Sequence, residues 1–137
     1  MDFSFISDYN QINDKFGRIF NMNNYKKISV GEEARTELHD SLALTGAEIS
    51  INILPAGANV PFVHSHKQNE EIYAVLSGEG RAVIDGESVE LKAGDFIRIS
   101  PSAKRQFFAS DKTAIKYICI QVKENSLENY TMTDAVV

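Results

Sequence analysis

Two histidines and a glutamate lie close together near the middle of the sequence, as His64, His66 and Glu71. On an extended backbone the side-chain direction repeats every second residue, so we expect His64 and His66 to point to the same face. Two imidazoles placed in this way can bind one divalent ion, and a carboxylate at the start of the next antiparallel strand can complete the set. Such a set suits Fe, Mn, Ni, Zn or Cu and leaves coordination positions open.

Two adjacent residues compete for the carboxylate role. Glu71 is in phase with Tyr73, whereas Glu70 is in phase with Ile72. Because successive side chains on a strand point to opposite faces, only one of the two glutamates can reach the histidines. Periodicity alone does not decide between them, so both stay candidates at this point.

The surrounding sequence predicts the short strands that would position these residues. Residues 48–54 alternate polar and apolar side chains, which is typical of a half-buried strand. Asp85-Gly86 predicts a hairpin because this pair tolerates the positive φ of a type I′ turn, and Ser77–Gly80 predicts a glycine-rich turn. Many short strands at near-regular spacing, without βαβ alternation, favour an all-β sandwich or barrel. The expected strands are 48–54, 72–76, 81–84, 88–91, 96–99, 106–108 and 113–122.

The length and the composition of the chain predict one domain. The chain has 137 residues, with 43% hydrophobic and 24% charged residues, as in a globular protein. We expect residues 1–34 to be a peripheral segment packed on the barrel, with a short helix around 12–20. Residues 35–122 form the expected barrel, and 123–137 a polar C-terminal tail.

Composition also excludes several classes of function. A net charge of -5 with scattered Lys and Arg argues against a nucleic-acid partner. No segment approaches the ~20 apolar residues of a membrane span, and the N-terminus lacks the basic region of a signal peptide. A cytoplasmic protein is the simplest interpretation. Cys119 is the only cysteine, so no intrachain disulfide can form, and its apolar surroundings predict a buried, inert thiol.

The segment Gly57–Gly78 resembles the first conserved motif of the cupin superfamily, G-x5-6-H-x-H-x3-4-E-x6-G. The six residues required before Gly78 select Glu71 over Glu70. The resemblance implies a small single-domain cupin of the conserved-barrel (cupin_2) type. Its expected fold is a double-stranded β-helix, a jelly-roll-like barrel. It also implies a homodimer.

The second cupin motif, G-D-x4-P-x-G-x2-H-x3-N, is matched only loosely after Gly94-Asp95. In register, Ser102 stands where a glycine is usual and Arg105 where the last histidine ligand is usual. The usual three-His-one-Glu shell is therefore incomplete. Either the metal stays on the three remaining ligands, with water or substrate oxygen as the fourth and Gln106 nearby, or Arg105 has displaced it. A guanidinium does not ligate a cation; it would pair with Glu71 or clamp a carboxylate or phosphate of a ligand.

Other pocket residues follow from the same register. Phe62, Tyr73, Phe107 and Tyr117 sit on strands that would frame the cavity beside Arg105 and Gln106. Most aromatic residues in such positions belong to the core, while one or two commonly line a ligand pocket.

Three functions are compatible with this site. The first is an enzyme that uses a divalent transition metal (Zn, Ni, Fe or Mn) to act on a small polar or anionic metabolite. There Glu71 would serve as ligand or general base and Arg105 would fix a substrate carboxylate. The second is a non-catalytic barrel that binds a sugar or an organic acid, with Arg105 in place of the last metal ligand. The third is metal-free acid–base catalysis, as in sugar-nucleotide epimerases, which the spacing supports least.

Overall fold

The computed structural model describes residues 11–13, 19–21 and 24–137, and their regular secondary structure is almost entirely β-strand. Its main elements are β3 (Arg35–Glu37), α2 (His39–Leu42), β4 (Glu48–Leu54), β5 (Asn69–Ile84), β6 (Glu87–Lys92), β7 (Phe96–Ile99), β8 (Arg105–Ala109), β9 (Ile115–Lys123) and η1 (Thr131–Thr133). Two further short strands, β1 (Gln11–Asn13) and β2 (Ile19–Asn21), pair with each other. The helix predicted around 12–20 is therefore wrong for these strands, and its middle lies outside the described residues. That residues 1–34 pack on the barrel stays a prediction.

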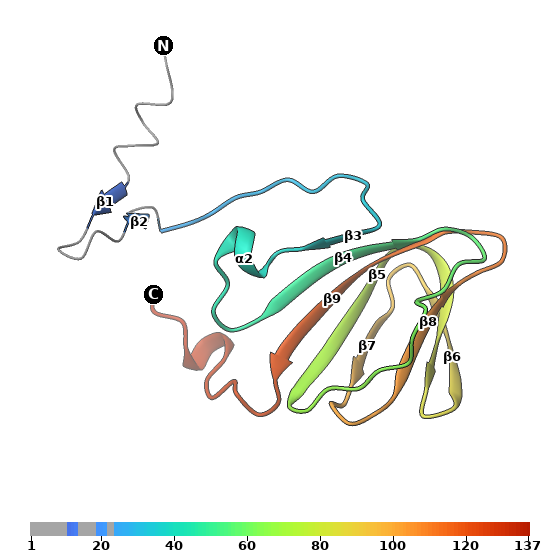
Figure 1. The fold of residues 1–137 in the computed structure, drawn as a ribbon. Coiled ribbons are helices and arrows are strands. Elements are labelled where there is room, and N and C mark those ends of the chain that lie inside the picture. The colour runs from blue at the N-terminus through green and yellow to red at the C-terminus, as the bar shows by residue number, and fades with distance from the viewer. Residues whose placement is uncertain (1–10, 14–18, 22–23) are drawn as a thin grey trace, which may run out of the picture.

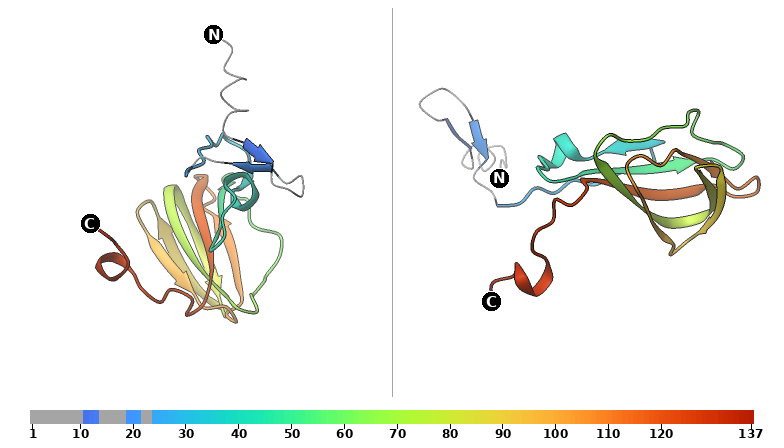
Figure 2. Two further views of the ribbon diagram at one scale, coloured as in Figure 1. Left: turned by 90° about the vertical axis from the view of Figure 1, so that its left-hand side faces the viewer. Right: turned by 90° about the horizontal axis from the view of Figure 1, so that it is seen from below.

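The seven main strands form one antiparallel system that wraps into a barrel-like roll (Figures 1 and 2). The order β3-β4-β9-β5-β6 runs through the long strand β5, which also pairs with β7 and β8. The first half of β5 pairs with β7 and β9, and its second half pairs with β6 and β8. One strand thus belongs to both faces of the roll, and the all-β barrel expected from the sequence is confirmed.

The predicted turn at Ser77–Gly80 is wrong, because β5 runs through it without interruption. The ladder with β9 instead shifts register between Val75 and Ser77, which is a β-bulge. Gly78 has φ +79, and a Cβ atom there would lie 1.7 Å from the carbonyl oxygen of Ala114. Glycine here lets the strand bend and lets a neighbouring backbone approach closely. A glycine-rich stretch looks the same in the sequence whether it forms such a bulge or a turn.

The Asp85-Gly86 hairpin is confirmed. It joins β5 to β6, with φ +48 at Asp85 and +83 at Gly86. Two positive φ values in succession are those of a type I′ turn, whose twist matches that of the flanking strands.

The core lies inside the roll and is rich in aromatic rings. Tyr73 stacks on Phe107 with ring centroids 4.2 Å apart, and Phe107 stacks on Tyr117 at 5.1 Å. The remaining members of the buried apolar cluster come from every strand of the roll except β3 and β4: Val75, Ala82, Leu91, Ile99, Ala109, Ile115 and Cys119.

Strand β4 turns its polar side inward. Ser50 and Asn52 are buried, with 2% and 6% of their surface exposed, whereas Ile49, Ile51 and Ile53 are only half-buried on the outer face. The alternation predicted from the sequence is therefore present, but the enclosed face is the polar one. The interior of the roll beside β4 is therefore lined by polar side chains. The isoleucines form an apolar surface on the outside.

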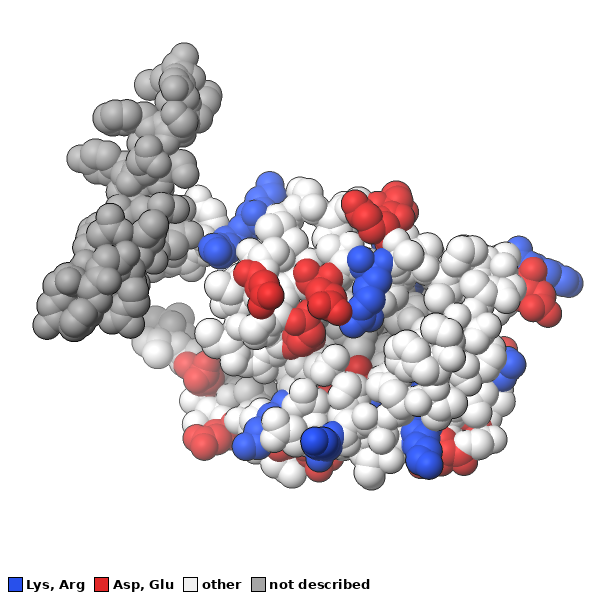
Figure 3. Space-filling model, viewed as in Figure 1, with Lys and Arg blue, Asp and Glu red and all other residues white. Residues whose placement is uncertain are grey.

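Charged side chains of both signs are interspersed over the face shown in Figure 3. Within the described part of the chain, no helix has the length and apolar character needed to cross a membrane.

Candidate metal centre

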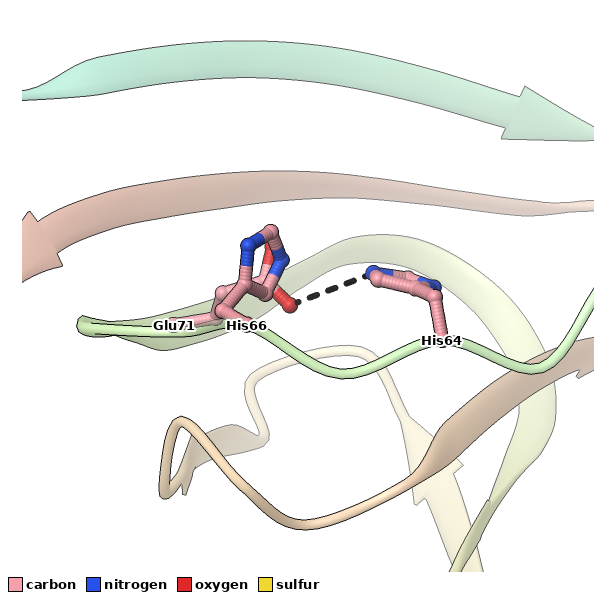
Figure 4. Close-up of side chains that lie close together, drawn as sticks. All are labelled: His64, His66 and Glu71. Carbon is pink, nitrogen blue, oxygen red and sulfur yellow. Dashed lines mark ion pairs between the residues drawn. The ribbon is translucent and has the colours of Figure 1, made fainter.

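The two histidines lie in the segment that leads into β5, and Glu71 is the third residue of that strand. His64 is tied to β8 by an isolated bridge to Arg105, in which each backbone N–H donates to the other residue's carbonyl oxygen, at 3.1 and 2.9 Å. The N–H of His66 donates to the carbonyl of Pro101 at 2.7 Å. These bonds hold both imidazoles over the start of β5, where they face Glu71 (Figure 4).

The nitrogen and oxygen atoms of the three side chains converge. His64 Nε2 lies 3.6 Å from Glu71 Oε1, and His66 Nε2 lies 3.3 Å from Glu71 Oε2. One potential ligand atom from each residue falls within 4.8 Å of the other two. The two imidazole rings meet edge to face, with centroids 5.1 Å apart. A separation of this size allows all three groups to contact a single ion.

The structure places Glu71 inside the roll and Glu70 outside it. Glu71 is only 2% exposed. Glu70 accepts a hydrogen bond of 2.5 Å from Arg98 Nε on the outer surface, where Arg98 also donates to Glu124 at 2.8 Å. Glu71 is therefore the carboxylate that meets the histidines.

Both oxygens of Glu71 already accept hydrogen bonds. Oε1 accepts from the Tyr73 hydroxyl at 2.7 Å and from Arg105 Nη1 at 2.5 Å, and Oε2 accepts from the Cys119 thiol at 3.0 Å. Burial by itself raises the pKa of Glu71, but the bonds from Cys119 and Tyr73 and the nearby positive charges outweigh it and hold the pKa below its usual value. The carboxylate is thus ionised and held in one orientation.

Arg105 is completely buried, and its guanidinium supports the site through hydrogen bonds. Besides Glu71, its guanidinium donates from Nη2 to the carbonyls of Ser100 and Pro101, at 2.5 and 3.4 Å. Of the two roles that the sequence leaves open for Arg105, the ion pair with Glu71 is the one present. The clamp on a ligand carboxylate is not, because Arg105 has no exposed surface with which to meet a ligand.

The other predicted pocket residues separate into two groups. Tyr73, Phe107 and Tyr117 are buried in the aromatic core beside Glu71. Phe62 is 58% exposed, and its ring lies 5.6 Å from that of His64.

Gln106 does not join the cluster. Because Arg105 and Phe107 point inward from β8, the residue between them lies on the opposite face. There Gln106 Nε2 donates to the carbonyl of Val60 at 2.7 Å.

Sequence reasoning missed three polar residues on the inner wall. Cys119 contacts Glu71 Oε2, and Ser50 lies opposite Cys119 in the ladder between β4 and β9. Asn52 Nδ2 donates to Ser50 Oγ at 3.0 Å. A signal for Cys119 was available, since it is in phase with Tyr117, a predicted pocket residue. For Ser50 and Asn52 the available signal was that they are the polar residues in the alternating pattern of β4.

The donor set fits a divalent metal ion. Among the described residues, three buried side-chain nitrogens have no hydrogen-bond partner: His66 Nε2, which lies 3.3 Å from Glu71 Oε2, His64 Nδ1, which is not the His64 nitrogen that faces Glu71, and Arg105 Nε. An orphaned imidazole nitrogen aimed at a carboxylate is what a metal site without its ion contains. Burial is the main cause that lowers the pKa of His64, so the ring is neutral at pH 7, as a metal ligand must be.

The family model for the cupin domain matches residues 51–121, which include the whole cluster. The crystal structure of a cupin protein from Bacteroides fragilis is 67% identical in sequence, with a TM-score of 0.83, and the match covers 85% of this chain and 98% of that one.

Two more distant relatives cover less of the chain. A predicted oxalate decarboxylase from Thermotoga maritima is 27% identical, with a TM-score of 0.52, over 55% of this chain and 64% of that one. An uncharacterised protein from Methanocaldococcus jannaschii is 32% identical over 77 residues, 56% of this chain and 61% of that protein. The chain thus spans less than two thirds of either relative.

Proposed function

Because this chain belongs to the cupin domain family, we propose that it is a metal-dependent enzyme acting on a small anionic metabolite at His64, His66 and Glu71. The observation that carries the proposal is the convergence of two imidazoles on one buried carboxylate, with His66 Nε2 left without a hydrogen-bond partner among the described residues. Two histidines and a carboxylate leave coordination positions for a substrate, and Zn, Ni, Fe and Mn are all suited to such a set.

Each residue of the cluster has a distinct task in this proposal. His64, His66 and Glu71 would hold the ion, and Arg105, Tyr73 and Cys119 orient the Glu71 carboxylate by donating to its two oxygens. When bound, a divalent ion supplies Lewis acidity that polarises a substrate oxygen. The bonds from Cys119 and Tyr73 are the largest causes that hold the pKa of Glu71 below its usual value, and the positive charge of Arg105 adds to them.

A small carboxylate is the substrate class that the observations favour. The predicted oxalate decarboxylase from Thermotoga maritima is named for a two-carbon dicarboxylate, and it shares 27% identity with this chain. The positive ion expected at the cluster would attract an anion. A cavity of about 250 Å³ beside Phe62 and Tyr117 has room for a small molecule.

Elemental analysis of protein purified without chelators tests the metal site. We expect close to one equivalent of a transition metal in the wild-type protein after loading with Mn, Ni, Zn or Fe, and a loss of most of it in His64→Ala/His66→Ala. His39→Ala is the matched control, because His39 is an exposed histidine on α2, paired with Asp40 outside the cluster. Absence of stoichiometric metal from the wild type, or its retention in the double variant, would refute the proposal.

A non-catalytic binding protein for a sugar or an organic acid is the second candidate. It is favoured by the hydrogen bonds that satisfy Glu71 without any metal, from Tyr73, Arg105 and Cys119. In that case His64→Ala/His66→Ala should leave affinity for the ligand nearly unchanged. A large loss of affinity would favour the metal-dependent enzyme.

We also propose that the protein is a homodimer formed through the outer face of β4, β9 and β5. On that face Ile49, Ile120 and Ile72 lie in one row across the three strands, and Ile51 and Ile118 lie in the next. Ion pairs border this surface, at Arg98 with Glu70 and Glu124, and at Lys116 with Glu32. An apolar centre with a charged rim is typical of an interface between copies of one chain.

A further inference from the structure

Arg35 lies on the edge strand β3, on the same inner row as the buried polar residues of β4. It lies on β3 directly opposite Asn52 in the antiparallel ladder, and its Nη1 donates to Asn52 Oδ1 at 2.8 Å. Its side chain is 51% exposed. Arg35 therefore has one side anchored to the barrel wall and the other open to solvent.

The open side borders the cavity described above. Arg35 and Asn52 line this space of about 250 Å³ together with Phe62 and Tyr117. Phe62 packs against His64, and the ring of Tyr117 lies 5.8 Å from that of Tyr73, which bonds to Glu71. His64, His66 and Glu71 do not themselves line the cavity; Phe62 and Tyr117 connect it to them through these contacts.

A polar row connects Arg35 to the interior. Arg35 bonds to Asn52, Asn52 bonds to Ser50, and Ser50 lies opposite Cys119, whose thiol bonds to Glu71. These contacts hold the Arg35 guanidinium in place through the amide of Asn52. A guanidinium held in this way loses less side-chain entropy when it binds a ligand.

The two arginines near the site therefore differ in what they can do. The guanidinium of Arg105 is paired with the Glu71 carboxylate in a fully buried ion pair. Within the described part of the chain, the exposed Glu37 is the one ionic partner of Arg35, 3.1 Å from its Nε, and water screens such a pair. Among the described residues, Nη2 of Arg35 donates to no protein acceptor.

We propose that Arg35 is the anion-recognising residue of this site, and that it binds a carboxylate of a small organic acid whose other end reaches the histidines. The inference rests on the proposed function for the role of that other end. A guanidinium matches the two oxygens of a carboxylate. Glu37, beside Arg35, disfavours the greater negative charge of a phosphate dianion.

Isothermal titration of the metal-loaded full chain with malonate, succinate and inorganic phosphate tests this assignment. For the better-binding dicarboxylate, Arg35→Gln should weaken affinity about 10- to 100-fold, the usual value of a charge-assisted bond. Arg35→Lys keeps the charge but loses the paired N–H donors of the guanidinium, so its affinity should lie between those of the wild type and Arg35→Gln. Arg98→Gln removes the same charge from the outer surface and should leave affinity within about twofold. Metal content and circular dichroism establish that each variant is folded.

Several outcomes would overturn the inference. These are equal affinity of Arg35→Gln and wild type, no binding of either dicarboxylate by the wild type, and tighter Arg35-dependent binding of phosphate than of malonate. The same titrations on chelator-treated protein separate the two proposals. If the wild type takes up no metal, the metal-dependent enzyme fails, while Arg35-dependent binding of a dicarboxylate would still support Arg35 as the anion site.

Discussion

Arg105 and Glu71 form an ion pair inside the barrel, with Nη1 2.5 Å from Oε1 and with 0% and 3% of their side-chain surfaces exposed. A pair of this kind is tightly coupled, because removing one partner leaves the other charge buried without compensation. Arg105 stands where the family motif usually has its last histidine ligand. At this position the chain has a residue that holds the Glu71 carboxylate in one orientation.

Loss of Arg105 should destabilise the protein strongly. We expect Arg105→Met to lower the free energy of unfolding by about 3–5 kcal/mol, because Glu71 would be left as an unpaired buried carboxylate. Urea unfolding of metal-free protein measures the change. Arg98→Met breaks the exposed pairs with Glu70 and Glu124, and should cost only about 0–1 kcal/mol. Similar losses in the two variants would contradict the assignment of a coupled buried pair.

Restoring the family's histidine should strengthen metal binding. In Arg105→His the new imidazole starts from a backbone that is bridged to His64, so it enters the site beside an existing ligand. Compared with Arg105→Gln, which removes the same charge without adding a ligand, we expect Arg105→His to bind Ni or Zn about tenfold more tightly or better. Competition against a chromophoric chelator gives the two affinities. An affinity for Arg105→His no higher than that of Arg105→Gln would refute the expectation.

The metal-free protein should lose stability on mild acidification. Burial is the main cause that lowers the pKa of His64 below its ordinary 6.5. Between the lowered pKa and 6.5 the unfolded chain binds more protons than the folded one, so the free energy of unfolding falls as the pH falls through this range. Chelator-treated His64→Gln should show a flatter slope between about pH 7.5 and about pH 5.5 in urea unfolding. An unchanged slope would mean that His64 is not the group responsible.

Gly78 should tolerate alanine much less than Gly57 does. Both have positive φ, +79 and +76, but a Cβ at Gly78 would meet the Ala114 carbonyl at 1.7 Å, while nothing lies within 4 Å of one at Gly57. We expect about 1–2 kcal/mol of destabilisation for Gly57→Ala from backbone strain alone. For Gly78→Ala we expect about 2–5 kcal/mol, because overpacking adds to that strain. Thermal or urea unfolding of both variants gives the comparison, and equal losses would argue against the close approach of β5 and the segment before β9.

The proposed dimer should depend on the outer isoleucine rows. Ile120 lies in the middle of one row, between Ile49 and Ile72, so Ile120→Lys would place a charge at the centre of the interface. We expect this variant to be monomeric by light scattering coupled to size exclusion, with an unchanged circular dichroism spectrum. Ser88→Lys places the same charge at an exposed position on β6 and should leave a dimer. A monomeric wild type, or a dimeric Ile120→Lys, would refute the proposed interface.

Features set by local backbone chemistry could be predicted from the sequence. The Asp85-Gly86 hairpin depends only on the φ values that these two residues tolerate. The shared direction of His64 and His66 follows from their spacing, together with an extended backbone. The barrel follows from the number and spacing of short strands. In each case the signal in the sequence is a pattern of residues a few positions apart.

Features that depend on which side of a strand is enclosed could not be predicted in the same way. Alternation places Glu70 and Glu71 on opposite faces of β5, but which face is enclosed depends on how the whole sheet curls into the roll. The polar face of β4 is buried because it meets Cys119 and the polar interior, against the usual preference for burying isoleucine.

The roles of the two arginines were also decided by tertiary structure. The sequence by itself determined the barrel, the paired histidines and the absence of a third histidine ligand at the second motif. Only the folded chain brings Arg105 against Glu71 and leaves Arg35 open at the cavity. The physical reason is that burial and charge pairing depend on contacts between residues far apart in the sequence, 34 positions for Arg105 and Glu71 and 17 positions for Arg35 and Asn52, and no local pattern encodes them.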